Sequence, residues 1–193
     1  MTAPQTHAPA AERDNDQVPP LVHGQRLTRA EFERRYDAMP ELKKAELIEG
    51  VVYMPSPVRS EQHGGPHADV ITWLGTYRAF TPGAAVNAEG TIRLGASSDP
   101  QPDAVLFIRP EHGGQARISS DDYVQGGPEL AAEVAASSAD YDLGVKLQLY
   151  QRHAIREYLV WRVLDGEFDW FVLRSGQYVR LAPDEAGVYH SEV

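Results

Sequence analysis

The sequence predicts an α/β domain with a mixed β-sheet flanked by helices. Two apolar runs, over residues 103–109 and 130–136, indicate buried strands. Between Ala139 and His153, apolar residues recur at the spacing of an amphipathic helix. Near the end of the chain, two glycine-containing turns separate three further strand-like segments. Helices and strands that alternate in this order are typical of an α/β domain.

The first twenty residues have a different composition from the rest of the chain. They are rich in Ala, Pro, Gln, Asp and Asn and hold few apolar side chains that could be buried, so residues 1–20 are predicted to be a disordered tail. Residues 21–193 then form one domain, which is long enough to bury a sizeable core.

Local signals place the elements along this domain. Thr28 and Glu31 form a helix-capping pattern, and Pro40 ends the helix. The glycines of Glu49-Gly50, Asp165-Gly166 and Ser175-Gly176 indicate hairpin turns. In chain order we expect a helix from Thr28 to Pro40, a hairpin over 46–54, a loop over 55–66, a helix over 67–80, strands over 85–94, 103–109 and 130–136, a helix over 139–153, and a C-terminal β-meander with strands over 157–163, 168–173 and 178–181.

The composition excludes some classes of functional site and argues against others. The net charge is -10, with 18 Lys and Arg against 28 Asp and Glu, which argues against tight metal-independent binding of nucleic acid. It does not exclude a nuclease, because bound cations neutralise an acidic site. The absence of cysteine excludes disulfides and thiolate metal sites. Without a long apolar run or a signal-peptide pattern, the chain is expected to be cytoplasmic and away from membranes.

Three charged residues stand out against the apolar runs. Asp103 opens the first run, Glu133 lies inside the second, and Lys146 follows 13 residues later in the predicted helix. Charges inside buried strands are rarely tolerated unless they are paired or bind a metal. The pattern suggests a divalent-metal hydrolytic site. The alternatives are a strand-start hydrogen bond for Asp103 and a structural salt bridge between Glu133 and Lys146.

Two other groups of side chains are given structural interpretations. His63 and His67 have a zinc-compatible spacing, but Gly64, Gly65 and Pro66 are expected to prevent a helical turn between them, so no zinc site is predicted. The C-terminal aromatic residues are interpreted as packing and not as a base-stacking surface; they are Trp161, Phe168, Trp170 and Phe171.

Four segments together resemble the Uma2 family of bacterial restriction-endonuclease-like proteins, which belongs to the PD-(D/E)XK nuclease superfamily. The resemblance covers roughly residues 27–190 and depends on the order and spacing of residues 45–57, 102–106, 130–134 and 146–150. It implies a restriction-endonuclease-like core, to which the C-terminal β-meander is an addition.

The resemblance also implies roles for individual residues. Asp103 matches the aspartate of the superfamily motif and Glu133 matches its second acid. The position where the superfamily commonly has lysine is Ala135, and in Uma2-like proteins a lysine on the next helix, here Lys146, takes its place. Glu46 matches the glutamate of the family's E-L-I-x-G segment.

These matches imply a metal-dependent endonuclease that hydrolyses phosphodiester bonds in DNA. Asp103, Glu133 and the backbone carbonyl of Val134 would bind Mg²⁺, with Mn²⁺ as an alternative. Lys146 would orient the attacking water, and Glu46 would hold a metal-bound water or a second ion. Superfamily members often form homodimers, for which the C-terminal aromatic strands are a candidate interface. The alternative is a non-catalytic interaction or regulatory module; a small-molecule esterase lacks support because no G-x-S-x-G segment is present.

Overall fold

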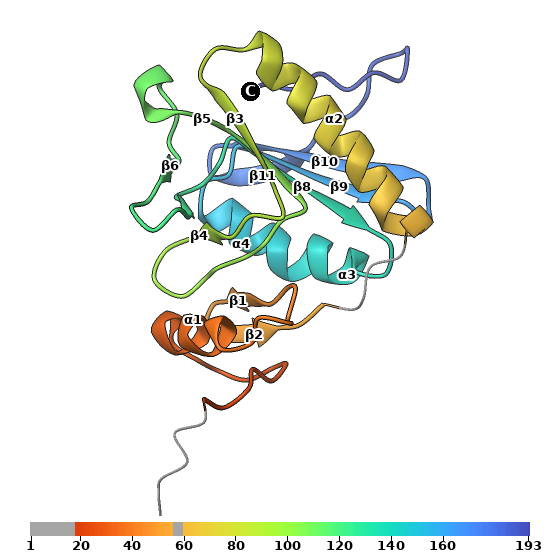
Figure 1. Ribbon diagram of the computed structural model, residues 1–193. Helices are drawn as coiled ribbons and strands as arrows, with labels where there is room; N and C mark the ends of the chain where they lie inside the picture. The colour runs from red at the N-terminus through yellow and green to blue at the C-terminus, as the bar shows by residue number, and fades with distance from the viewer. Residues whose placement is uncertain (1–17, 56–59) are drawn as a thin grey trace, which may run out of the picture.

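A computed structural model describes residues 18–55 and 60–193. Figure 1 shows a central sheet with helices on both faces and a small N-terminal layer beside it. Within the described ranges, no helix is long and apolar enough to cross a membrane. The predicted disordered tail concerns residues 1–20, of which 1–17 lie outside the described residues.

The first half of the chain contains α1 (Arg29–Asp37), β1 (Glu46–Ile48), β2 (Val51–Tyr53), the π-helical turn η1 (Ser60–Gly64), α2 (Gly65–Phe80), β3 (Ala84–Ala88) and β4 (Ile92–Arg93). The second half contains β5 (Ala104–Ile108), the 3₁₀ turn η2 (Pro110–His112), β6 (Arg117–Ile118), β7 (Val124–Gln125), β8 (Leu130–Ala135), α3 (Ala139–Tyr141), the π-helical turn η3 (Asp142–Lys146), α4 (Leu147–Arg152), β9 (Glu157–Arg162), β10 (Glu167–Arg174) and β11 (Gln177–Arg180).

The central sheet has six strands in the order β11-β10-β9-β8-β5-β3. Strands β8 and β9 are parallel and every other pair in this sheet is antiparallel, which confirms the predicted mixed sheet. The predicted C-terminal meander is β9-β10-β11, and it extends the same sheet. All six residues of β8 are buried, as its apolar run indicated.

Each face of the sheet packs against a different helix. On one face, Val70 and Leu74 of α2 join a core with Leu106 and Ala132. On the other face, Tyr150 of α4 lies in a core that contains Val105 and Ala131. Because side chains alternate along a strand, Glu133 projects to the same face as Ala131, towards η3 and α4.

The N-terminal layer has its own small core and holds the hairpin against the sheet domain. The predicted hairpin is confirmed, with Glu49 at φ 50° and Gly50 at φ 77°, the left-handed conformations that a two-residue hairpin turn requires. Leu47 of β1 exchanges backbone hydrogen bonds with Asp99. This contact fixes the position of the neighbouring residue, Glu46, relative to the start of β5.

Two sequence predictions are wrong in detail. Residues 85–94 do not form one strand: β3 ends at Ala88, Glu89 adopts φ 53°, and β4 pairs with β7 in a separate three-stranded sheet. The predicted loop over 55–66 becomes helical at Ser60, because η1 continues into α2 and Pro66 occupies its first turn, where proline is tolerated. Residues 56–59 of that predicted loop lie outside the described residues.

The predicted helix over 139–153 is present as the run α3, η3 and α4. Its middle part is π-helical from Asp142 to Lys146, which local periodicity did not reveal. Both Asp142 and Lys146 are buried in this turn. π-helical turns inside α-helices are often found at functional sites.

Candidate active site

Asp103 and Glu133 occupy opposite positions at the same end of the neighbouring strands β5 and β8. The antiparallel register pairs Ala104 of β5 with Ala132 of β8, so the next residues outward are Asp103 and Glu133. Both residues are 3% exposed. The Oδ2 atom of Asp103 accepts a hydrogen bond of 2.8 Å from the backbone N–H of Val134, which ties the two strands together at this end.

Lys146 connects two of the predicted acids. Its Nζ lies 2.8 Å from Oε1 of Glu133 and 2.9 Å from Oε1 of Glu46, and it is 3.8 Å from Oδ1 of Asp142. The hydroxyl of Tyr150, one helical turn further on, donates to Glu133 Oε1 at 3.1 Å. The structure therefore brings Glu46, Glu133 and Lys146 into direct contact.

Glu46 is held from the side of the N-terminal layer. Its Oε1 accepts a 2.6 Å hydrogen bond from the backbone N–H of Gln101, and its Oε2 accepts one of 3.2 Å from the hydroxyl of Tyr141. These neutral donors and the ammonium group of Lys146 leave the carboxylate buried and fully hydrogen-bonded.

Asp103 has partners that sequence reasoning missed. Lys44 Nζ donates to Oδ1 at 3.1 Å, and His63 Nε2 lies 3.1 Å from Oδ2. His67 Nε2 lies 2.7 Å from the backbone carbonyl oxygen of Asp103. No salt bridge between Asp103 and Lys146 occurs among the described residues, so Asp103 has its own set of contacts beside the Lys146 cluster.

The expectation that no helical turn joins His63 to His67 is wrong. The two residues lie on the continuous helix η1–α2, and their ring centroids are 5.7 Å apart. Their spacing of four residues was the signal that could have identified them. Lys44 carried no such signal, because nothing in its local sequence shows that it approaches Asp103.

Burial and charge shift the ionisation of this cluster in different directions. Burial opposes ionisation of Asp103, but the hydrogen bond with His63 and the charges of Lys44 and Lys146 hold its pKa well below the ordinary value. Burial, reinforced by the neighbouring carboxylates, raises the pKa of Glu133 to about 8. Burial also disfavours the charged form of Lys146, but Glu133, Glu46 and Asp142 raise its pKa well above the ordinary value.

The cluster has more acidic than basic side chains. It contains four carboxyl groups and two lysines, so full ionisation leaves a formal charge of 2 − 4 = −2; the residues are Glu46, Asp103, Glu133, Asp142, Lys44 and Lys146. Carboxylate oxygens are the ligands that Mg²⁺ prefers, so the donor chemistry fits a hard divalent cation. Across the described parts of the chain, however, no three His, Asp or Glu residues are arranged to hold a metal ion. Lysine ammonium groups instead contact the carboxylate oxygens that a metal would use.

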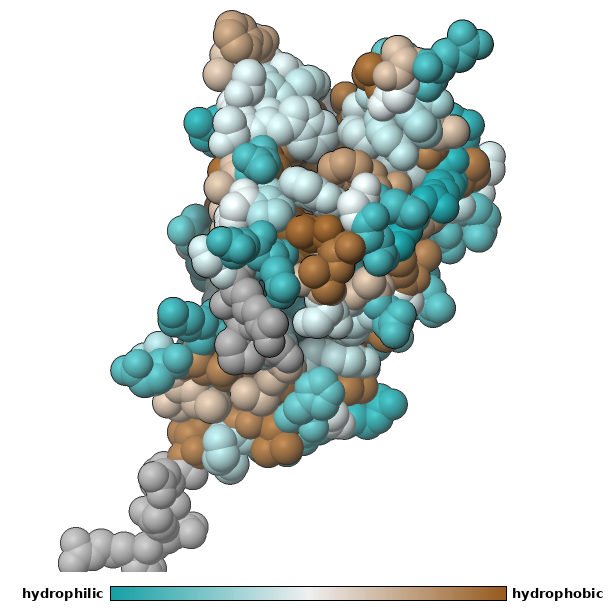
Figure 2. All heavy atoms as spheres, turned by 90° about the vertical axis from the view of Figure 1, so that its right-hand side faces the viewer, coloured by the Kyte–Doolittle hydropathy of each residue, from teal (hydrophilic) through white to brown (hydrophobic). Residues whose placement is uncertain are grey.

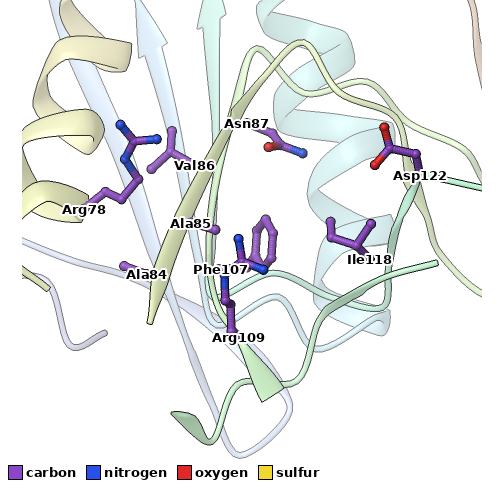
Figure 3. A pocket seen from close by; sticks show the side chains of 9 residues that line it. All are labelled: Arg78, Ala84, Ala85, Val86, Asn87, Phe107, Arg109, Ile118 and Asp122. Carbon is purple, nitrogen blue, oxygen red and sulfur yellow. The ribbon is translucent and has the colours of Figure 1, made fainter. Parts of the chain in front are cut away.

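A hollow of about 410 Å³ lies away from these acids, beside the outer edge of β3. Figure 3 shows Arg78 on the α2 side of β3 and Ile118 and Asp122 on the opposite side. Arg109, which also lines the hollow, follows the C-terminal end of β5, whereas Asp103 precedes its N-terminal end. The hollow is therefore separate from the candidate active site.

Comparisons with known proteins identify the family and the fold. The sequence model of the Uma2 family, described as "Putative restriction endonuclease", matches residues 29–192. No curated protein sequence matches the chain. Among solved structures, the fold is similar to a crystal structure described as "a putative nuclease belonging to DUF820" from Anabaena variabilis ATCC 29413, with a TM-score of 0.60 and 14% identity. The similarity covers 82% of this chain and 93% of that chain.

Proposed function

We propose that this chain, which belongs to the Uma2 family, is a metal-dependent endonuclease that hydrolyses phosphodiester bonds in DNA. The observation that carries the proposal is the pair of buried acids, Asp103 and Glu133, opposed on adjacent strands, with Lys146 in contact with Glu133. Buried carboxylates that outnumber their cationic partners require a further positive charge or protons. A divalent cation would supply that charge.

Mg²⁺ or Mn²⁺ would be held by Asp103, Glu133 and the backbone carbonyl of Val134, and it would take the place of the lysine contacts to the two carboxylates. When bound, such an ion would acidify a water molecule and withdraw charge from a phosphate oxygen. Lys146 would balance the charge that develops on the phosphate, a role that suits a compact ammonium group. Glu46 holds Lys146 in place from the opposite side of the cluster, with 2.9 Å between the two charged groups.

Substrate approaches the cluster from the side of its least buried members. The side chains of Lys44 and His63 are 22% and 17% exposed, whereas those of Glu133 and Lys146 are 3% and 2% exposed. Lys44 and His63 both contact Asp103, so the entry side combines basic side chains with an acid whose pKa is held below its ordinary value. This combination suits a phosphate group that comes close to a carboxylate.

A second candidate function is supported by the burial of the same cluster. Lys146 already contacts Glu46 and Glu133 in a nearly solvent-free environment, which is the arrangement of a structural ion-pair network. On this alternative, the domain is a non-catalytic interaction or regulatory module that retains a nuclease fold. The two candidates differ in whether a divalent cation replaces protons and lysine contacts at Asp103 and Glu133.

A cleavage assay distinguishes them. Purified protein should cut DNA with Mg²⁺ or Mn²⁺ and not with a chelator, while RNA offered in parallel tests the choice of substrate. Asp103→Asn should lower the cleavage rate by at least about a hundredfold, because it removes a charge that acts directly on the reacting groups. The matched control is Glu129→Gln, a buried carboxylate that lies outside the cluster. Equal rates for wild type and Asp103→Asn, or no cleavage of any nucleic acid, favour the non-catalytic module.

A further inference from the structure

An aromatic groove of about 400 Å³ lies on the α2 face of the sheet. Trp73 of α2 forms one wall, and the rings of β9 and β10 form the other; these rings are Trp161, Phe168 and Trp170. All three tryptophans of the chain therefore line one groove. Figure 2 shows this side of the molecule, where apolar atoms gather in the centre between hydrophilic ridges.

The groove lies on the opposite face of the sheet from Glu133 and Lys146, and it approaches the candidate active site only at the end of the sheet where Asp103 lies. Trp161 is the register partner of Val134 on β8, and the backbone N–H of Val134 donates to Asp103. On the helical wall, His67 contacts the carbonyl of Asp103, and Asp69 lines the groove two residues later. A single strand with one phosphate at Asp103 would pass around this end of the sheet to bring a neighbouring base to the groove.

The rings offer flat surfaces that are only partly covered. Trp73 is 41% exposed and Phe168 is 36% exposed. Trp161 and Phe168 stack on each other with centroids 5.0 Å apart and planes inclined by 30°. Trp170 is 7% exposed, so packing explains it, as the sequence suggested. Packing in the core does not explain the exposed ring surfaces of Trp73 and Phe168 beside it.

Asp69 gives the groove a single acidic group. It is exposed, and within the described residues its carboxylate makes no hydrogen bond or ion pair. A carboxylate in this position repels a phosphate but accepts hydrogen bonds from an amino group. Cytosine, adenine and guanine have an exocyclic amino group, whereas thymine and uracil do not.

We infer that this groove binds an unpaired, amino-bearing nucleobase of a single-stranded segment, by stacking on Trp73 and Phe168 and hydrogen bonding to Asp69. The inference rests on the proposed nuclease function and specifies its substrate. Stacking on aromatic rings provides affinity without a basic surface, which suits a chain of net charge -10. Duplex DNA, whose bases are stacked on each other, would gain little from this groove.

Binding can be measured without cleavage, because the tryptophans report on the groove directly. Tryptophan fluorescence and the anisotropy of a labelled strand would be followed in a chelator with oligo(dC), oligo(dT) and an abasic strand of equal length. We expect oligo(dC) to quench the fluorescence and to bind more tightly than oligo(dT), and the abasic strand to bind weakly. Equal binding of the abasic strand and oligo(dC) would overturn the inference, since both carry the same phosphates.

Three variants sharpen the test. Trp73→Ala should weaken oligo(dC) binding by roughly 5- to 100-fold, the effect of losing one base-stacking ring. Phe80→Ala is the matched control, because Phe80 is an 84% exposed aromatic residue on the same helix that does not line the groove. Asp69→Asn should reduce the preference for oligo(dC) over oligo(dT) by about tenfold, since it removes a charged acceptor.

The outcomes separate this inference from the proposed function. Cleavage with unchanged oligo(dC) affinity in Trp73→Ala rejects the groove and keeps the nuclease. Base-dependent binding without cleavage keeps the groove and rejects the nuclease. If Trp73→Ala instead converts a dimer to a monomer in light scattering and oligo(dC) does not quench the fluorescence, the groove is an interface between two copies and the inference is wrong.

Discussion

The two ends of strand β8 each have a buried glutamate, and their surroundings differ. Glu129, just before the strand, is 1% exposed and accepts the backbone N–H groups of Ile108 at 2.7 Å and Gln115 at 3.4 Å. Glu133, near the other end, is 3% exposed and is held by the ammonium group of Lys146 and the hydroxyl of Tyr150. Burial alone therefore does not distinguish a structural carboxylate from a candidate functional one.

Glu157, at the same end of the sheet as Glu129, repeats the structural arrangement. It is fully buried and accepts hydrogen bonds of 2.9 Å from the indole N–H of Trp170 and the hydroxyl of Ser191, and one of 2.5 Å from the backbone N–H of Glu192. These donors are neutral, and they fix the C-terminal segment to the sheet. Neutral donors satisfy such a carboxylate completely and leave no need for a metal ion.

The comparison teaches that the type of partner identifies the candidate site. At the Glu129 end, each acid accepts hydrogen bonds from neutral donors of its own, and the guanidinium of Arg156 lies further off, 4.0 Å from Oε1 of Glu129. At the Glu133 end, Lys146 is shared between Glu46 and Glu133, and the acids outnumber the lysines. Shared cations leave charge uncompensated, which is a reason for a cation or a proton to bind there.

The largest effect is expected for Lys146→Met. In a chelator this substitution should lower the free energy of unfolding by about 3–5 kcal/mol, because it leaves buried carboxylates without their shared cation. Mn²⁺ should then raise the melting temperature of the variant more than that of the wild type, since the added ion replaces the lost charge. Thermal melts with and without Mn²⁺ measure both effects.

The control for this prediction is Lys43→Met, which removes an exposed lysine from the segment before β1. It should change the stability little and leave the response to Mn²⁺ as in the wild type. If Lys146→Met melts like Lys43→Met, the lysine does not balance the charge of the cluster.

A smaller effect separates the two ends of the sheet. Glu157→Gln should cost about 1–3 kcal/mol of stability, because an amide places its own N–H group among donors that need an acceptor. The cleavage rate of the folded variant should not change. Denaturant unfolding and the cleavage assay check the two parts, and a loss of cleavage at full stability would contradict the separation of structural and functional acids.

Local sequence patterns predicted most of the elements and the candidate acids. The hairpin at Glu49-Gly50 and the apolar run of β8 depend on neighbouring residues alone, so they could be identified without a structure. The approach of Lys44 and His63 to Asp103 depends on how the N-terminal layer and α2 pack on the sheet. Such contacts join residues 59 and 40 positions apart, and no local pattern encodes them.

The π-helical turn η3 is a second feature of the candidate site that local sequence patterns could not predict. A regular helix was expected from Ala139 to His153, and a helical run is found there. Within it, η3 turns both Asp142 and Lys146 inwards, four residues apart, with 3.8 Å between their charged groups. Hydrophobic spacing predicts a helix here but does not predict that its middle part is π-helical.

The last effect that we predict is a pH dependence of stability that comes from Glu133. In the metal-free protein the pKa of Glu133 is raised from 4.5 to about 8, so the folded state holds a proton that the unfolded state releases. The folded state therefore binds more protons in this range, and its stability should fall as the pH rises from about 5 to about 8. Melting temperatures in a chelator should fall by roughly 7–14 °C more for the wild type than for Glu133→Gln, which has no such proton.

A divalent ion that binds at Glu133 has to displace the proton, so its stabilising effect on the wild type should increase over the same pH range. If Glu133→Gln instead follows the wild-type curve, the carboxyl group of Glu133 does not hold the extra proton in the folded protein. The distinction between neutral and shared cationic partners would then have no consequence for the charge of the site.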